Sequence, residues 1–378
     1  MILEQPPFWF ILIAFLGALC PLVFIHEYGH YIVGRWFGVG AETFSIGFGR
    51  EIAGWTDKRG TRWKVGWLPL GGYVRFTGDM DPASMGKDLH KLAPDIRARA
   101  FHAKPVWQRA LIVAAGPAAN FLAAILIFAA FFAIVGIPRT PPIVGQVQAG
   151  SSAAAAGLAT GDRILSVAGR EVETFADVRQ VVSMRPGETV AIIVDRGGRQ
   201  MNLTSKLREV VEADNFGQRF RIGRLGVAPV ERPTYERPGA LQVIPEATEH
   251  TVKVTRAMAE GLWQIITGRR PVQELGGPMK MAQIAGQQAS LGWFEFFQIV
   301  ALFSINLGFI NLLPVPMLDG GHLALYAVEA ARRKPLGERA QEWMFRGGLA
   351  ALMTLLLFTT LNDLGSFGLW HRLGELMG

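Results

Sequence analysis

Residues 8–37 read FWFILIAFLGALCPLVFIHEYGHYIVGRWF, a stretch that joins a membrane-spanning pattern to a metal-binding pattern. From Phe8 to Ile25 it contains no Asp, Glu, Lys or Arg, and as a helix it can cross a hydrocarbon core of roughly 30 Å. His26, Glu27 and His30 follow in the order H-E-x-x-H. Residues i and i+4 share one face of a helix, so both imidazoles can reach one metal ion while the glutamate handles a bound water. The stretch therefore predicts a metal site near the end of a membrane helix.

Three further stretches have a membrane-spanning pattern. Ala110–Ile137 and Phe296–Leu318 carry no charged residue, and Gly347–Leu361 becomes long enough when Trp343 and Met344 extend it. Of all 378 residues, 50% are apolar and 18% are charged, and the mean hydropathy is +0.25. A soluble domain usually carries about 25% charged residues. We therefore expect an α-helical integral membrane protein with about four transmembrane helices.

The basic residues predict how these helices are oriented. No Lys or Arg precedes the first apolar stretch and no small-residue cleavage site follows it, so we expect a permanent helix rather than a secretion signal. Lys and Arg flank the spans within residues 34–109 and 331–346, which predicts that these segments are cytoplasmic and that both termini lie outside. The net charge of +7 fits cytoplasmic loops beside anionic lipid. Basic runs interleaved with aromatic residues are absent, so we expect no nucleic-acid partner.

Two neutral histidines leave the charge of a divalent cation uncompensated, so a third, anionic ligand is needed. The only cysteine, Cys20, allows neither an internal disulfide nor a cysteine-based zinc site. Asp319 is the candidate, because it follows the run Asn311–Leu318, in which Pro314 and Pro316 break helical hydrogen bonding. The alternative is that Asp319 is the N-cap of the next helix.

A β-hairpin is expected between the first two spans. Residues 62–67 alternate polar and apolar, residues 68–72 make a turn through Gly71 and Gly72, and residues 73–76 resume an extended pattern. The aromatic content beside a membrane helix indicates a hairpin that dips toward the bilayer. The alternative is an ordinary soluble hairpin.

A mixed α/β module follows the second span. Strands are expected at residues 143–147, 163–167, 189–194 and 199–207, and helices at residues 153–158 and 174–182. An amphipathic helix is expected further on, with one apolar face formed by Val254, Met258, Leu262, Ile265 and Ile266.

Two motifs together resemble the site-2 protease family. They are H-E-x-x-H in the first span and N-x-x-P-x-P-x-L-D-G at residues 311–320, and the closer resemblance is to the bacterial RseP-type regulated intramembrane proteases. It extends over most of the chain, including Pro69–Val74, Lys104–Arg109, Ala115–Pro117, Asn120-Phe121 and Gly276–Pro278.

The resemblance implies a role for each motif residue. His26, His30 and Asp319 would bind Zn²⁺, and Glu27 would be the general base and acid. Asn311 and Pro314 would lie at the substrate. Gly71 and Gly72 of the hairpin, with Gly47 and Gly49 nearby, would form the membrane re-entrant β element that pairs with an unwound substrate. The substrates would be single-span membrane proteins, such as anti-sigma factors or signal-peptide remnants.

The module after the second span resembles a PDZ domain of the bacterial protease type, most clearly in Ala155–Leu158 and Gly161–Ile164. The resemblance implies a peptide or protein partner for it and a location in a bacterial inner membrane with the PDZ domain outside the cytoplasm. Many RseP-type proteins have two tandem PDZ domains, whereas this sequence shows one clear copy. We expect seven segments: a first transmembrane helix with H-E-x-x-H (1–37), a cytoplasmic or re-entrant β region (38–106), a second transmembrane helix (107–137), the PDZ domain (138–210), an extracytoplasmic extension with an amphipathic helix (211–293), a third transmembrane helix with the Asp319 motif (294–331), and a fourth transmembrane helix with the tail (332–378).

The sequence thus predicts an intramembrane zinc endopeptidase. The alternative is a catalytically silent PDZ-bearing membrane scaffold. Retention of Glu27 argues against that alternative, because a scaffold has no need of a base. A different multi-span H-E-x-x-H protease is a further alternative, but such enzymes more often use a glutamate as the third ligand.

Overall fold

The computed structural model describes residues 6–78, 93–213, 219–230, 234–272, 275–334 and 337–366. Within these residues, four helices are long and apolar enough to cross a membrane. They are α1 (Phe8–Trp36), α3 (Val106–Ile134), α8 (Trp293–Asn311) and α10 (Glu338–Ser366), the last through its part Glu342–Gly365. The prediction of about four such helices is confirmed. The chain divides into two compact units, which we describe separately.

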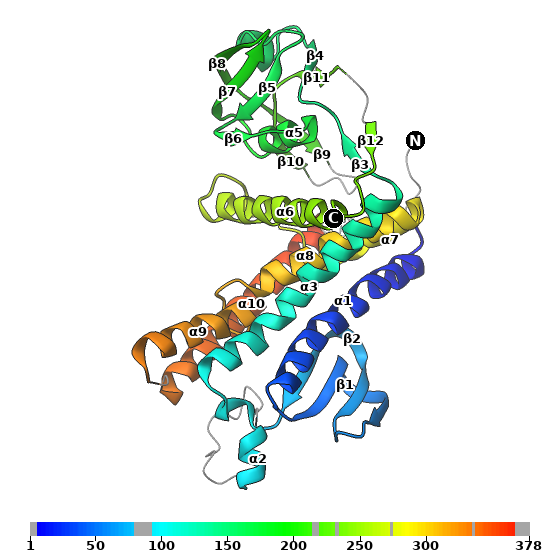
Figure 1. Ribbon diagram of the computed structural model, residues 1–378, viewed down its shortest axis with the longest axis vertical. Coiled ribbons are helices and arrows are strands. Elements are labelled where there is room, and N and C mark those ends of the chain that lie inside the picture. The colour runs from blue at the N-terminus through cyan, green and yellow to red at the C-terminus, as the bar shows by residue number, and fades with distance from the viewer. Residues whose placement is uncertain are drawn as a thin grey trace, which may run out of the picture. The chain divides into compact units, whose positions relative to one another are not determined.

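The membrane unit comprises residues 1–130, 244–260 and 275–363. Its N-terminal half is built around α1, which packs on α7 (Pro278–Leu291) and α8 (Figure 1). One apolar core joins the three helices, with Phe15 and Leu22 of α1 against Ala285 of α7 and Phe303 of α8. Further along α1, Gly29 leaves no room for a Cβ beside the backbone of Ala115 in α3, so these two helices approach closely.

The third predicted span is interrupted in the structure. We expected it to continue from Phe296 to Leu318, but α8 ends at Asn311, and seven residues separate it from α9 (Asp319–Arg332). The reason lies in Pro314 and Pro316, which cannot donate helical hydrogen bonds. Met317 in this turn has φ of 80°, a left-handed conformation that is unusual for a residue with a side chain.

Strands β1 (Ala41–Thr56) and β2 (Arg62–Phe76) form an antiparallel sheet beside α1 (Figure 1). The predicted pairing of residues 62–67 with residues 73–76 is wrong. The first part of β1, residues 41–46, pairs with residues 72–76 on one side and with residues 62–65 on the other. The second part of β1, residues 51–56, pairs with residues 62–66. Both strands therefore fold back on each other, and Gly47, Gly49 and Gly71 make this possible with φ values of 85°, 84° and 103°.

The sheet is joined to the helices by an aromatic and aliphatic core. Tyr31 of α1, Phe44 of β1 and Ile112 of α3 are buried together with Tyr326 of α9. Phe44 also stacks on Trp63 of β2, with ring centroids 4.3 Å apart. Four elements that are distant in sequence are thereby fixed around the segment of α1 that carries His26 and His30.

The second unit is largely the segment between α3 and α6 (Val243–Ile266). A four-stranded sheet has the order β6-β5-β7-β8, formed by Arg170–Glu171, Arg163–Val167, Thr189–Arg196 and Arg199–Lys206. Three two-stranded pairs accompany it: β3 (Ile137–Arg139) with β12 (Thr234–Glu236), β4 (Val144–Val147) with β11 (Val227–Pro229), and β9 (Arg208–Ala213) with β10 (Arg219–Arg224). The helices are α4 (Ser152–Ala155) and α5 (Phe175–Ser183).

This unit has its own apolar core, in which Val144, Ile164, Val167, Ile192 and Val194 have no exposed surface. Capping residues stabilise the first turns of its helices. Ser151 caps α4, and Thr174 with Asp177 forms a capping box at the start of α5. The predicted amphipathic helix is α6, and two short helices, α2 (Pro94–Arg99) and η2 (Phe101–Ala103), precede α3.

Candidate metal centre

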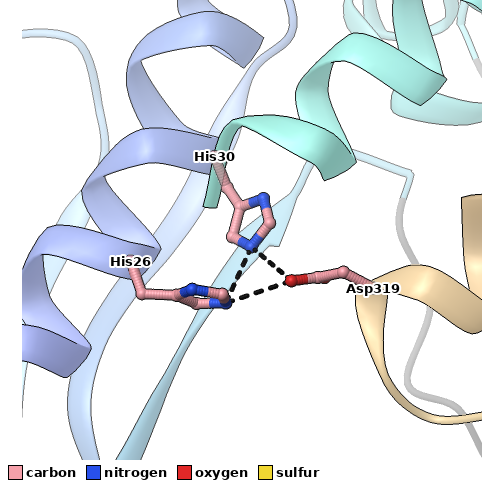
Figure 2. Close-up of side chains that lie close together, drawn as sticks. All are labelled: His26, His30 and Asp319. Carbon is pink, nitrogen blue, oxygen red and sulfur yellow. Dashed lines mark hydrogen bonds and ion pairs between the residues drawn. The ribbon is translucent and has the colours of Figure 1, made fainter. Parts of the chain in front are cut away.

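His26, His30 and Asp319 converge on one point (Figure 2). The Oδ2 atom of Asp319 lies 3.1 Å from Nε2 of His26 and 3.4 Å from Nε2 of His30, and the two Nε2 atoms are 3.2 Å apart. Both imidazoles are buried, with 7% and 9% of their residue surfaces exposed. Two imidazole nitrogens and a carboxylate oxygen, each aimed at the same small space, are a donor set that can hold a divalent cation.

The local folding of two helices produces this convergence. His26 and His30 are one turn apart on α1 and therefore share a face. Asp319 is the first residue of α9, whose N-cap is Leu318 and has no side-chain capping bond. The alternative in which Asp319 serves as the N-cap is therefore wrong. At the first turn its carboxylate is instead free to point at the histidines, where the helix dipole also favours a negative charge.

His30 has a second contact that fixes where its proton lies. Its Nδ1 atom is 2.9 Å from the backbone oxygen of Ile112 in α3. A carbonyl oxygen only accepts hydrogen bonds, so Nδ1 of the neutral imidazole carries the proton and donates it. Nε2 is then left with its lone pair toward Asp319 and His26. Outer partners of this kind commonly orient histidine ligands of metals.

His26 has a different outer partner, the side chain of Asn120 in α3. Nδ2 of Asn120 lies 3.0 Å from Nδ1 of His26. The sequence analysis quoted Asn120 only as part of a familiar stretch and assigned it no role. The signal available in the sequence is a carboxamide within the uncharged stretch Ala110–Ile137, because a polar side chain inside an apolar helix is expensive unless it is paired.

Glu27 lies on the same helix, next to His26, and is half-buried. It is close enough to His26, His30 and Asp319 to interact with their charges. Strand β2 covers it, because a Cβ added to Gly72 would lie 3.1 Å from Cγ of Glu27. The structure thus brings one predicted hairpin glycine directly against the predicted base.

The other predicted substrate residues lie around this centre without touching it. Gly47 and Gly49 belong to β1 and face the backbone at Gly66 and Leu68 and the ring of Trp67, and Gly71 faces the ring of Phe48. Asn311 ends α8, half-buried, and Pro314 is exposed in the turn before α9. Among the described residues, no hydrogen bond joins Asn311 to His26, His30 or Asp319.

Comparison with known proteins identifies the family. The family model described as Peptidase family M50 matches residues 14–355, a range that includes both His26 and Asp319. This chain belongs to peptidase family M50, the site-2 protease family. The family predicted from the two motifs is thereby confirmed.

Bacterial relatives resemble this M50 chain over nearly its whole length. A protein of Agrobacterium fabrum named "Putative zinc metalloprotease" is 42% identical over 360 residues, which cover 94% of this chain and 96% of the relative. A protein of Caulobacter vibrioides named metalloprotease MmpA is 38% identical over 393 residues, covering 98% of this chain and 99% of the relative.

One solved structure resembles a quarter of this M50 chain. It is the PDZ domain of an SdrC-like protein from Listeria monocytogenes, which is 22% identical, covers 25% of this chain and 94% of that chain, and has a TM-score of 0.19. A likeness of this size does not establish the fold of the second unit.

Proposed function

We propose that this protein is a zinc-dependent intramembrane endopeptidase that hydrolyses peptide bonds of single-span membrane proteins within or beside the bilayer. One observation carries the proposal. Two buried histidines at the end of an uncharged helical stretch and one carboxylate from a distant helix direct three ligand atoms at a common point. Membership of family M50 and the zinc metalloprotease name of the Agrobacterium relative agree with it.

The residues present fit a zinc ion. Oδ2 of Asp319 is buried, and the Nε2 atoms of His26 and His30 lie 3.1 and 3.4 Å from it. A carboxylate oxygen in a buried group of two imidazoles is stabilised by a positive charge between the three side chains. Three protein ligands also leave a fourth position open, as catalytic zinc sites do. His26, His30 and Asp319 are therefore the proposed ligands.

The proposed chemistry divides between the ion and Glu27. When bound, zinc supplies a water of lowered pKa and polarises the scissile carbonyl. Glu27 accepts the proton of the attacking water and returns it to the nitrogen of the leaving amine. Burial of His26 and His30 and the cover that Gly72 places over Glu27 limit competing bulk water at this point.

A helical substrate must be unwound before its carbonyl can be attacked, and β2 is suited to hold it. Among the described strands, residues 72–76 pair only with β1 and so form an edge of the sheet, where the backbone of Val74 interacts with the carboxylate of Glu27. An extended peptide added to such an edge regains the backbone hydrogen bonds that its helix loses. Gly72 lies in this segment and against Glu27, so a strand added there would pass the proposed base.

Lipid is the proposed surrounding of the sheet and of the helices. Phe48, Ile52, Trp55 and Trp67 of β1 and β2 are largely exposed, with between 44% and 69% of their surfaces accessible. Exposed aromatic and aliphatic side chains in such number mark a surface that contacts other apolar matter. This supports a membrane-associated sheet rather than a soluble one.

The second unit is the proposed PDZ-type recognition module, for a peptide or protein partner. Bacterial relatives and the distribution of basic residues support a location in the bacterial inner membrane with this unit on the extracytoplasmic side. Glu27 argues against the scaffold alternative, since binding alone does not need a proton acceptor beside three metal-ligating groups.

The test compares purified wild-type protein in detergent with Glu27→Gln. We expect both to bind about one zinc per chain, and only the wild type to cleave a single-span model substrate. Glu295→Gln, which changes a glutamate at the start of α8, is the matched control and is expected to cleave normally. If neither wild type nor variant binds zinc or cleaves, although both are folded, the scaffold becomes the better explanation.

A further inference from the structure

Asn120 is the buried group that the proposed chemistry leaves unexplained. Its side chain has no exposed surface, and its Nδ2 atom lies 3.0 Å from Nδ1 of His26. Its Oδ1 atom is buried and has no hydrogen-bond partner. A buried carboxamide normally uses its oxygen as well as its nitrogen, and either of these two atoms fits the position that faces His26.

The present arrangement determines the tautomer of His26. When Nδ2 of Asn120 donates to Nδ1 of His26, Nδ1 is the acceptor and the single proton of the neutral ring lies on Nε2. Nε2 is the atom that faces Oδ2 of Asp319 at 3.1 Å. In this tautomer His26 donates to Asp319 and has no lone pair to offer a metal ion.

Metal binding through Nε2 requires the other tautomer. The proton then lies on Nδ1, which becomes a donor and needs an acceptor where Nδ2 of Asn120 now lies. A half-turn of the carboxamide about its terminal torsion places Oδ1 there, because the oxygen and nitrogen of an amide are almost equal in size.

We propose that Asn120 is a positioning residue whose carboxamide turns over when metal binds, so that Oδ1 accepts from Nδ1 of His26 and holds Nε2 ready as a ligand. This inference rests on the proposed function. It also makes the two histidines unequal. His30 is held in its ligating tautomer by a backbone oxygen, whereas His26 reaches that tautomer through a side chain that can serve both states.

A hydrogen bond from α8 fixes the backbone at Asn120. Oγ of Ser304 in α8 donates a 2.7 Å hydrogen bond to the backbone oxygen of Asn120, and Ser304 has no exposed surface. The backbone of α3 is therefore fixed to α8 at the residue that carries the carboxamide. Rotation of the amide group is the change that remains available.

Two substitutions of Asn120 distinguish the loss of its hydrogen-bond acceptor from the loss of its packing. Asn120→Asp retains an oxygen acceptor and gives the carboxylate–histidine–metal arrangement that is common around zinc. Asn120→Leu has similar size but no hydrogen-bonding group. Gln283→Leu is the matched control, because Gln283 of α7 is another buried carboxamide in the membrane unit with a buried, unpartnered oxygen, Oε1.

The experiment measures Zn²⁺ and Co²⁺ affinity of the full chain in detergent by competition with a chelator, together with thermal unfolding of the metal-free proteins. We expect Asn120→Leu to bind roughly 10–100-fold more weakly, the usual loss for an outer partner of a histidine ligand. Asn120→Asp is expected to bind at least as tightly as wild type, and Gln283→Leu the same as wild type.

The inference is overturned if Asn120→Leu binds as tightly as wild type, or if Gln283→Leu loses as much affinity. It also falls if Asn120→Asp is folded yet binds metal about tenfold or more weakly than wild type, a result that decides the matter even if Asn120→Leu does not fold. A folded wild-type protein that binds no metal overturns the proposed function itself, which is a different result from unequal binding among variants.

Discussion

Arg109, in the first turns of α3, donates a 2.7 Å hydrogen bond through Nη2 to Oε1 of Glu329 in α9. Only 12% and 19% of the two side chains are exposed, and the guanidinium also lies 4.8 Å from the ring centroid of Tyr326. The pair therefore ties the helix that begins with Asp319 to the helix that carries Asn120 and Ile112. Distant parts of the chain that meet at the candidate metal centre are held together by this ion pair.

Breaking this ion pair is predicted to destabilise the protein and to weaken metal binding. Arg109→Met leaves the carboxylate of Glu329 largely buried without its partner, which costs about 3–5 kcal/mol of unfolding free energy in comparable pairs. Thermal unfolding in detergent and zinc affinity check this. Arg62→Met, which breaks the more exposed Arg62–Glu51 pair, is the control and is expected to cost at most about 1 kcal/mol. Equal effects of the two substitutions would contradict the assignment.

Gly72 is predicted to be required for cleavage rather than for metal binding. A Cβ at this position would lie 2.8 Å from the backbone oxygen of Ser45 and 2.9 Å from Cγ1 of Val23, so Gly72→Ala must displace β2 or the side chain of Glu27. Small displacements of a catalytic group commonly cost about 10²-fold in rate. We expect Gly72→Ala to lose at least about tenfold in cleavage of the model substrate with unchanged zinc content.

The control for that prediction lies on α1. Gly17 has no atom within 4 Å of where its Cβ would lie, so Gly17→Ala is expected to cleave like wild type. Normal cleavage by Gly72→Ala would show that β2 does not constrain Glu27.

The sequence predicted well the features that depend on residues close together along the chain. The long uncharged stretches predicted the four long apolar helices, and the spacing of His26 and His30 predicted a shared helix face. Asp319 was found by charge balance and by its motif, and the structure places it beside both histidines. The role of the three residues as zinc ligands stays a prediction.

The features that the sequence did not reveal depend on contacts between distant segments. Alternation indicated strands at residues 62–67 and 73–76, but alternation does not say which strand is the partner, and both pair with β1. Asn120 is 94 residues from His26, so no local spacing connects them. The break before Asp319 was visible as two prolines, but its consequence, the end of α8 at Asn311, was not.

Two aspartates of the membrane unit are predicted to behave differently when removed. Asp319→Ala deletes a proposed ligand, so zinc affinity should fall by more than the roughly 10–100-fold expected for an outer partner. Asp363 of α10 instead accepts from the backbone nitrogens of Gly277 and Lys280, at 3.0 and 3.1 Å, and so satisfies the start of α7. Asp363→Ala should cost about 1 kcal/mol of stability, as loss of a helix cap does, and leave zinc content unchanged.

Measured zinc content and thermal unfolding of both variants distinguish these roles. Undiminished zinc affinity in Asp319→Ala would remove Asp319 from the proposed ligand set. A loss of zinc in a folded Asp363→Ala protein would show that the metal centre depends on α10 as well.

Asp162 of the second unit is predicted to make the stability of that unit sensitive to acid. Its carboxylate is fully buried and accepts from Nε of Arg196 at 2.6 Å and from the backbone nitrogen of Ala159 at 2.9 Å. The hydrogen bond from Arg196 holds the pKa of Asp162 below its ordinary value of 3.8. A carboxyl group with a lowered folded-state pKa stabilises the fold fully above its unfolded-state pKa, and this contribution is lost as the pH falls toward the folded-state value.

The measurement is circular dichroism of residues 137–236 during denaturant unfolding between pH 7 and pH 2.5, since the core residues of the second unit all lie within this segment. The wild type should lose stability once the pH falls below about 4, where an unfolded aspartate binds its proton. Asp162→Asn should be less stable at pH 7 and should show a flatter dependence on pH below 4, because the group that titrates is gone. Asp195→Asn is the control, because Asp195 accepts from the backbone nitrogen of Gly198 at an exposed turn. If Asp162→Asn and wild type lose stability in parallel on acidification, another group governs the acid response, and the Asp162–Arg196 pair contributes little to it.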